Sequence, residues 1–167
     1  MKLKKLLPIA AVASTAAIVA PIITACSCAT TVKLDYFDEA EATISNKEPI
    51  TINANKFYCV TINMKDFEFP YDLSELAWAL GVWDGNSEEA ITYPLNSFSV
   101  EIDGTQLTEY KGKDQPGQNQ FQYVEEHGSF FLGGHEGDVK KDSVVKIKLK
   151  VDADKKDVYF SFTATQG

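Results

Sequence analysis

Short segments in which apolar and polar residues alternate are the feature that most limits how this chain can fold. In residues 143–151 the apolar side chains stand at every second position, and most of the positions between them are lysines. Residues 56–65 alternate in the same way, with Tyr58, Val60 and Ile62 on one face and further apolar side chains at one end of the other face. A period of two separates the two faces of a strand, so the first segment predicts a half-buried strand and the second a central one.

Turn signals separate several segments of this kind. Asp103-Gly104 stands between two alternating stretches, which is the pattern of a tight β-hairpin. Residues 111–120 are polar and contain glycine and proline, so they indicate a loop. Further strand candidates occupy residues 32–37, 49–54, 121–124, 129–132 and 158–164. Short strands at this spacing predict an all-β fold, an antiparallel β-sandwich rather than alternating β-α-β units.

Residues 72–81 differ from their surroundings. Apolar side chains recur there with helical spacing, Asp72 is a candidate N-terminal cap and Gly81 can end a helix. We therefore expect one short helix over 72–81. The residues Leu76, Trp78, Leu80 and Val82 also alternate, so a strand remains the open alternative.

The N-terminus has the organisation of an export signal. Lysines at positions 2, 4 and 5 precede an uncharged, mostly apolar run over 6–25. The run ends in Ile23-Thr24-Ala25-Cys26, which resembles the lipobox of bacterial lipoproteins. The resemblance implies that the Cys26 thiol receives a diacylglyceryl group and that the chain is cut just before it. An uncleaved membrane helix is the alternative, and the prolines at 8 and 21 disfavour it.

This assignment divides the chain into three parts: a signal peptide over 1–25, a lipidated tether over 26–32 and a β-sandwich domain over 33–167. Two acyl chains are sufficient for stable membrane attachment. The expected location is therefore the extracytoplasmic face of the cell membrane, with membrane lipid as a partner of Cys26.

The second half of the chain resembles a known domain. Residues 98–105 as a hairpin, a glycine-containing loop, residues 141–147, and a charged turn into residues 158–162 are similar to the small immunoglobulin-like domain of surface lipoproteins from low-GC Gram-positive bacteria and their wall-less relatives. The similarity covers 97–162 and implies an immunoglobulin-like β-sandwich. Residues 65–94 depart from that family, because the family has a short loop where this chain carries both tryptophans.

The chain has three cysteines, of which Cys26 is assigned to the lipid. Cys59 lies in a strand-like run, and we expect it to be a small buried apolar residue. A Cys28–Cys59 disulfide is the alternative, because disulfides form outside the cell.

The most promising binding segment is 82–94. It places Trp83 and Tyr93 beside Asp84, which combines apolar anchors with a polar group. Trp78 is expected in the core. A ligand there could be a protein or a glycan.

Metal and catalytic sites are weakly indicated. The acidic stretches 84–89 and 152–157 suit solvated turns better than calcium loops, and His127 and His135 stand among turn glycines. We expect no metal and no cofactor. A formal net charge of −8 argues against a nucleic-acid partner.

The sequence thus predicts a non-catalytic binding module on the cell surface. The alternative is a surface hydrolase that uses carboxylates near Glu125, Glu126 and His127. No nucleophile-and-base motif supports that alternative.

Overall fold

The described chain is an all-β sandwich built from two mixed sheets. The structure is a computed structural model that describes residues 30–74, 76–85, 89–90, 98–114, 116–132, 138–150 and 154–166. No α-helix occurs in these ranges, and the two short 3-10 turns are η3 (Met64–Asp66) and η4 (Glu125–His127). The all-β class and the sandwich architecture are therefore confirmed, and they are consistent with the expected immunoglobulin-like domain.

The smaller sheet has five strands in the order β1-β5-β13-β8-β9. Their bounds are β1 (Thr30–Lys33), β5 (Phe57–Asn63), β13 (Val144–Lys150), β8 (Phe98–Ile102) and β9 (Thr105–Gln106). The strands pair antiparallel except β1, which runs parallel to β5. The first strand thus begins at Thr30, within the segment expected to be a tether.

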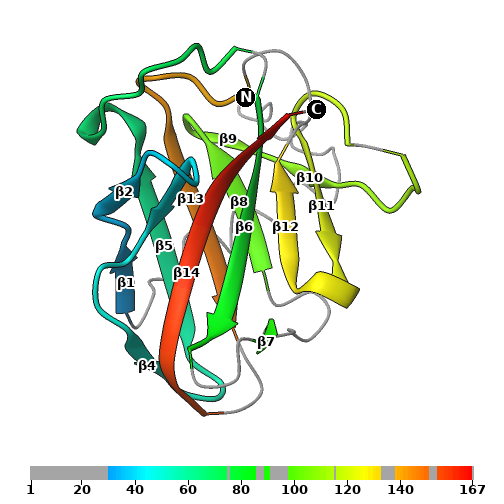
Figure 1. Cartoon of the computed structure of the whole chain (residues 1–167). Coiled ribbons are helices and arrows are strands. Elements are labelled where there is room, and N and C mark those ends of the chain that lie inside the picture. The colour runs from blue at the N-terminus through cyan, green and yellow to red at the C-terminus, as the bar shows by residue number, and fades with distance from the viewer. Residues whose placement is uncertain are drawn as a thin grey trace, which may run out of the picture.

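The larger sheet has nine strands, seven of them in the order β10-β11-β12-β6-β14-β3-β2. Their bounds are β10 (Thr108–Glu109), β11 (Gln120–Val124), β12 (Ser129–Leu132), β6 (Leu76–Asp84), β14 (Lys155–Gln166), β3 (Thr43–Ser45) and β2 (Tyr36–Asp38). The remaining strands are β4 (Ile50–Ile52), which pairs with β14, and β7 (Glu89–Ala90), which pairs with β6. In Figure 1, β6 and β14 run side by side across the front of the molecule.

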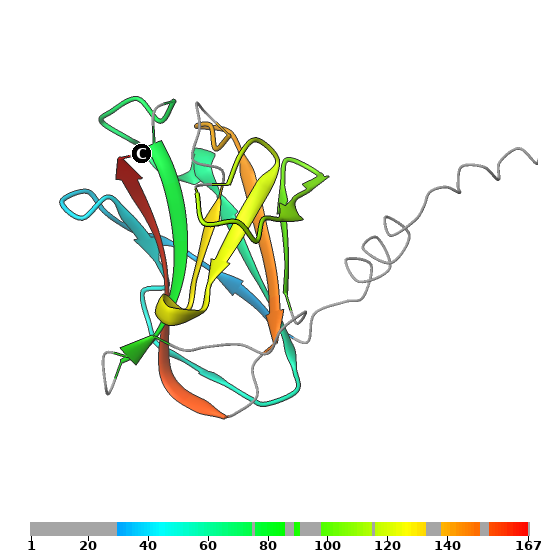
Figure 2. The ribbon, with the colours of Figure 1, turned by 90° about the vertical axis from the view of Figure 1, so that its right-hand side faces the viewer.

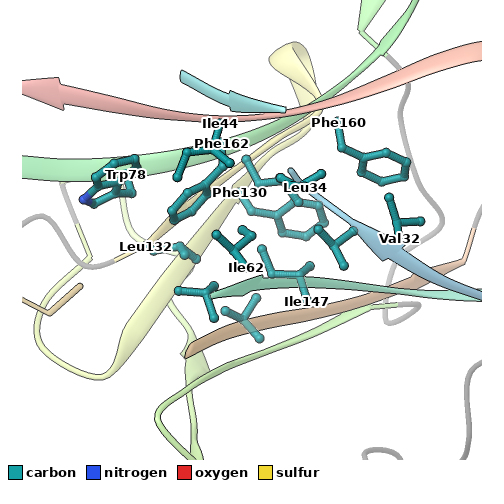
Figure 3. Packing of buried hydrophobic residues seen from close by; sticks show 14 of the residues in the cluster. Val32, Leu34, Ile44, Ile62, Trp78, Phe130, Leu132, Ile147, Phe160 and Phe162 are labelled. Atoms are coloured by element: carbon teal, nitrogen blue, oxygen red, sulfur yellow. The ribbon is translucent and has the colours of Figure 1, made fainter. Parts of the chain in front are cut away.

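The core lies between the two sheets. Figure 2 shows the layers from the side, with β6 and β14 in one and β13 in the other. The inward-facing side chains of both layers interdigitate, as Figure 3 shows for residues from Ile62 and Ile147 on one side to Phe130 and Phe162 on the other. A side chain of this size that is fully buried contributes about 1.5–3 kcal/mol.

The alternating segments form the strands that their sequences predict. β5 lies between β1 and β13, and Tyr58, Val60 and Ile62 are buried while the residues between them face outward. β13 buries Val145, Ile147 and Leu149. Period-two alternation therefore located these strands correctly, because only one of their faces meets the core.

One lysine of β13 is an exception to the expected pattern. Lys148 points to the outer face, as predicted, yet only 6% of its surface is exposed. Its ammonium nitrogen lies 4.7 Å from the centre of the Phe57 ring on the neighbouring strand. β13 has a strand on each side, so neighbouring side chains cover the aliphatic stem while the charge rests on an aromatic face.

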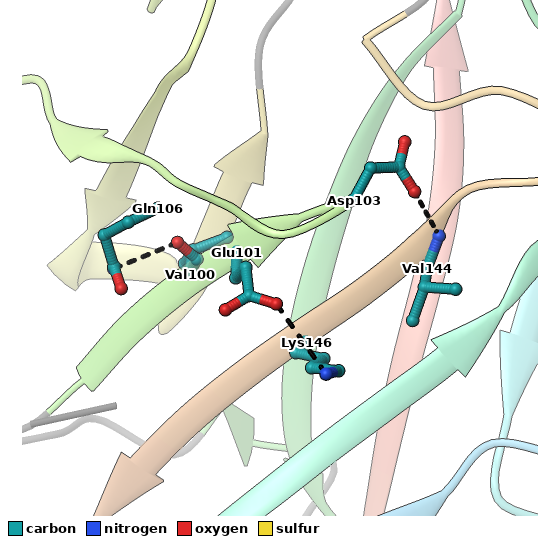
Figure 4. A network of polar contacts seen from close by, with 6 residues as sticks. All are labelled: Val100, Glu101, Asp103, Gln106, Val144 and Lys146. Carbon is teal, nitrogen blue, oxygen red and sulfur yellow. Dashed lines mark hydrogen bonds and ion pairs between the residues drawn. The ribbon is translucent and has the colours of Figure 1, made fainter. Parts of the chain in front are cut away.

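The Asp103-Gly104 turn joins β8 and β9 as expected. Both residues have left-handed backbones, with φ of 51° and 82°, which suits a tight hairpin. Figure 4 shows how Asp103 reaches Val144 at the start of β13. In the same network Gln106 donates a hydrogen bond to the Val100 carbonyl, and Lys146 lies 3.7 Å from Glu101.

The helix expected over 72–81 is wrong. Asp72 does accept a hydrogen bond from the Ser74 amide, but it caps a turn, and Leu76 begins strand β6. β6 pairs with β12 on one side and with β14 on the other. The strand buries Trp78, Leu80 and Val82 completely. The hydrogen bonds to two distant strands and the burial of these side chains outweigh the local preference for a helix that the spacing of the apolar residues indicates.

Cys59 is not a simple buried apolar residue. It faces outward from β5, is partly exposed and is disulfide-bonded. The other two cysteines of the chain, Cys26 and Cys28, lie outside the described residues.

Candidate binding face

The outer face of the larger sheet carries small and hydroxyl-bearing side chains between aromatic ones. Alternation along each strand identifies them, because the residues between them point into the core. We call the outward-facing residues of β3, β6, β12 and the part of β14 from Tyr159 onward the Trp83 face: Thr43, Ser45, Ala77, Ala79, Gly81, Trp83, Ser129, Phe131, Tyr159, Ser161, Thr163 and Thr165. None of these twelve side chains is charged.

Trp83 stands near the end of β6 with 37% of its surface exposed. Its indole leans over Gly81, two residues back on the same face. A Cβ atom at Gly81 would lie 2.7 Å from the indole Nε1 and 3.0 Å from Cε2, which is closer than carbon atoms approach without displacement. Glycine at 81 therefore makes the room in which the ring packs against the sheet.

Tyr159 lies directly opposite Trp83 on the neighbouring strand. Opposite side chains on one face of an antiparallel pair have Cβ atoms about 4.5–5.5 Å apart, but the two rings lean apart along the strands, Trp83 toward Gly81 and Tyr159 toward Gly85. A Cβ at Gly85 would lie 3.0 Å from the Tyr159 ring. The Gly85 amide also donates a hydrogen bond to the Asp157 carbonyl, at 2.9 Å. Glycine at position 85 thus leaves the room that the Tyr159 ring occupies.

Hydroxyl groups occupy the middle of the face. Thr43 and Thr163 are paired across β3 and β14, and their Oγ1 atoms form a hydrogen bond of 2.8 Å. Ser45 and Ser161 are the next pair along the same strands. At the outer edge Tyr36, paired with Ser45, exposes 48% of its surface. A hydroxyl both donates and accepts, so this row presents hydrogen-bonding groups without net charge.

A pocket lies at the end of the Trp83 face that is farther from Trp83. It has a volume of about 430 Å³ and is lined by Ala77, Phe131 and Thr165 of the face, by Gln122 and Leu132, and by Lys113, Asp114 and Pro116 of the loop before β11. Gln122 donates a hydrogen bond to the Gly112 carbonyl at 2.8 Å, which ties this loop to the sheet. Trp83 stands six positions after Ala77 along β6, which is about 20 Å of strand.

The structure separates the residues that the sequence grouped as a binding site. Trp83 is exposed on the Trp83 face. Asp84 is the next residue of an extended strand and points the other way, with its carboxylate 3.9 Å from the Lys155 ammonium and only 17% of its side chain exposed. Tyr93 lies outside the described residues. The aromatic neighbour that the structure gives Trp83 is Tyr159, which the sequence did not single out.

The residues of the hydrolase alternative lie elsewhere. Glu125 and Glu126 are exposed in the turn η4, at the end of the β11–β12 hairpin. The side chain of His127 and the whole of His135 lie outside the described residues, as do 86–88 and 152–153 of the acidic stretches. In the part of the chain that is described, no three His, Cys, Asp or Glu side chains gather closely enough to hold a metal ion.

A sequence signal for the Trp83 face exists but was missed. The outward positions of β6 carry alanine, alanine and glycine before Trp83, and those of β14 carry serine and threonine. A solvent-facing strand is ordinarily charged, as on β13 with its three lysines. The run of small and hydroxyl residues at the outward positions of two neighbouring strands therefore sets this face apart from the lysine-bearing face of β13.

No protein-family model and no curated protein matches this chain. Within the described ranges, no helix has the length and apolar character needed to cross a membrane.

Proposed function

We propose that this protein is a lipoprotein anchored through Cys26 to the extracytoplasmic face of the cell membrane, and that it acts as a non-catalytic binding module. The observation that carries the binding role is Trp83, a large aromatic side chain exposed on an uncharged sheet face. Tryptophan is among the residues enriched at positions that dominate binding energy, and an uncharged face costs less to desolvate than a charged one.

The cysteines support the proposed location. Cys59 is disulfide-bonded, and disulfides persist outside the cytoplasm. If the Cys26 thiol carries lipid, Cys28 is the remaining cysteine of the chain that can pair with Cys59. We therefore include a Cys28–Cys59 disulfide in the proposal. Peptide mapping under non-reducing conditions should find these two cysteines linked, and a Cys26–Cys59 link would refute both the pairing and the lipid assignment.

Metabolic labelling with a fatty acid tests the anchor. The wild-type protein and Cys28→Ala should both carry the label, whereas Cys26→Ala should lose it and leave the membrane fraction. Labelling of Cys26→Ala equal to that of wild type would contradict the proposal.

A thermal melt of Trp83→Ala tests whether the ring belongs to a binding face or to the core. A side chain whose role is to bind a ligand contributes little to folding stability, so the melting temperature of Trp83→Ala should differ from that of wild type by no more than about 2–3 °C. A loss of about 3 kcal/mol or more, as for a buried tryptophan, would show that Trp83 is structural.

A further inference from the structure

We propose that the Trp83 face binds an uncharged oligosaccharide, laid along β6 and β14 from the Trp83–Tyr159 pair toward the pocket beside Phe131. The inference rests on the proposed binding function and names the chemical class of its ligand. Three features of the face support it: the aromatic side chains of Trp83 and Tyr159, the row of hydroxyl groups, and the absence of charge among its twelve residues.

The aromatic pair suits a sugar ring. One face of a pyranose presents C–H bonds, while its rim carries hydroxyls, so the ring is apolar on its flat side and polar at its edge. Tryptophan and tyrosine have the same division, with an apolar, electron-rich ring and a polar N–H or O–H. Trp83 and Tyr159 occupy opposite positions on neighbouring strands, with the indole beside Gly81 and the phenol ring beside Gly85, so each ring can stack on a sugar on its own side of the pair.

The hydroxyl row supplies partners for the rim of a sugar. Thr43, Thr163, Ser45 and Ser161 form two facing pairs, and Thr165 continues the row to the pocket. Every sugar hydroxyl both donates and accepts, and so does every serine or threonine hydroxyl. From Ser161, opposite Gly81, to Thr165, opposite Ala77, the row follows β14 for four positions, about 13 Å, and Trp83 extends the face to about 20 Å. That length accommodates several sugar units in line rather than a single ring.

The charge pattern narrows the ligand further. The outer face of the smaller sheet carries Lys146, Lys148 and Lys150 of β13 beside Glu101 of β8, whereas the twelve residues of the Trp83 face include no charge. The charges next to them are Asp38, opposite Thr43 on β2, and Lys113 and Asp114 at the pocket. An anionic glycan or a phosphate-bearing ligand requires basic groups. Lys113 is accompanied by Asp114 in the pocket, and the chain as a whole is acidic. A neutral saccharide meets no repulsion here and leaves no buried charge unpaired.

A second copy of the chain is a poorer occupant. Stable dimers bury about 800 Å² on each partner and are rich in apolar contacts. Only two large hydrophobic side chains are classed as exposed in the described chain, Tyr36 and Trp83. A surface that is mostly hydroxyl-bearing favours a ligand that is itself hydroxylated.

The test uses the purified full-length protein and a panel of immobilised oligosaccharides. Neutral probes are hexamers of glucose in α and β linkage, of N-acetylglucosamine and of galactose; acidic probes are heparin fragments and oligosialic acid. The expected result is binding to at least one neutral probe. Trp83→Ala should weaken that binding at least tenfold, and Thr163→Val severalfold. Thr61→Val, which changes the same residue type on the outer face of β5, is the matched control and should bind as wild type does.

Fluorescence gives a second readout. In Trp78→Phe the only remaining tryptophan is Trp83, so addition of the neutral probe should shift its emission and protect it from quenching by acrylamide. Gly81→Ala should weaken binding as well, because the new methyl group displaces the indole.

Binding to acidic probes alone, or to no probe, would overturn the saccharide inference. Neither result would overturn the proposed function, because the melt of Trp83→Ala tests whether Trp83 is structural and the labelling of Cys26 tests the anchor. Neutral binding that persists unchanged in Trp83→Ala would also overturn the inference, because the ligand would then lie elsewhere on the protein.

Discussion

At the scale of single residues, Asp103 fixes the β8–β9 turn to the strand beside it. One carboxylate oxygen accepts the Val144 amide at 2.8 Å, and the other accepts the Ser143 hydroxyl at 2.9 Å. The residue also has a left-handed backbone, which aspartate and asparagine tolerate better than alanine does.

We expect Asp103→Ala to lower the free energy of unfolding by about 2 kcal/mol, because both hydrogen bonds are lost and the backbone is strained. Asp103→Asn should cost less, since it keeps one acceptor and the favourable backbone. Urea denaturation of the two variants beside wild type measures the difference. Equal losses in both would mean that the charge alone holds the turn.

The ionisation of Tyr71 is expected to lower the stability of the folded state at alkaline pH. Burial raises the pKa of its phenol, and the negative charge of Glu39 raises it further. The folded-state pKa therefore exceeds the unfolded value of about 10. The neutral phenol's contribution to the free energy of unfolding is fully present below about pH 10 and is lost as the pH rises through the folded-state pKa.

Tyr71→Phe should therefore lose less stability than wild type between pH 9 and pH 11, as measured by melting temperature at each pH. At pH 7 the variant should be no less stable, because the buried Tyr71 hydroxyl has no hydrogen-bond partner. An identical alkaline loss in both proteins would rule out Tyr71 as the titrating group.

At the scale of elements, β6 serves two purposes with its two faces. Inward, Trp78 is fully buried and stacks on Phe162 with ring centres 4.7 Å apart. Outward, Trp83 is exposed above Gly81. Their odd separation along one strand places the two indoles on opposite faces.

We expect Trp78→Ala to lower the free energy of unfolding by about 3–5 kcal/mol, because it empties a large volume between the sheets. Trp83→Ala, five residues away on the same strand, should change it by less than about 1 kcal/mol. Chemical denaturation of both variants makes this comparison within one element. Similar losses would show that both faces of β6 are buried.

At the scale of the whole molecule, the proposed anchor and the sandwich are closely joined. β1 begins at Thr30, four residues after Cys26, so these positions lie no more than about 14 Å apart. β1 runs parallel to β5 from that point, and Cys59 of β5 is disulfide-bonded. The domain is therefore held near the membrane by the proposed anchor and not at the end of a long linker.

A disulfide that closes a loop of about 30 residues stabilises a protein by roughly 3–4 kcal/mol in the chain-entropy account. Cys59→Ser and Cys28→Ser should therefore lower the free energy of unfolding by similar amounts, measured in urea without reductant. Cys26→Ala should leave it unchanged. Destabilisation by Cys26→Ala instead of Cys28→Ser would reassign the pairing.

The sequence by itself determined the strands in which one face is apolar and the other polar. In β5, β13 and the end of β14 every second side chain is apolar, and this period is a property of the chain alone. Asp103-Gly104 likewise specified its own hairpin, since the required left-handed backbone is a local preference. The all-β class followed from these local signals.

Tertiary structure decided the features that depend on distant partners. Residues 73–82 satisfy both helical and strand spacing, and β12 and β14, far along the chain, made 76–84 a strand by pairing with both edges. The same pairing placed Tyr159 beside Trp83, turned Asp84 toward Lys155 and covered Lys148. Burial and cross-strand contact are properties of the assembled sheet, so no local pattern in the sequence contains them.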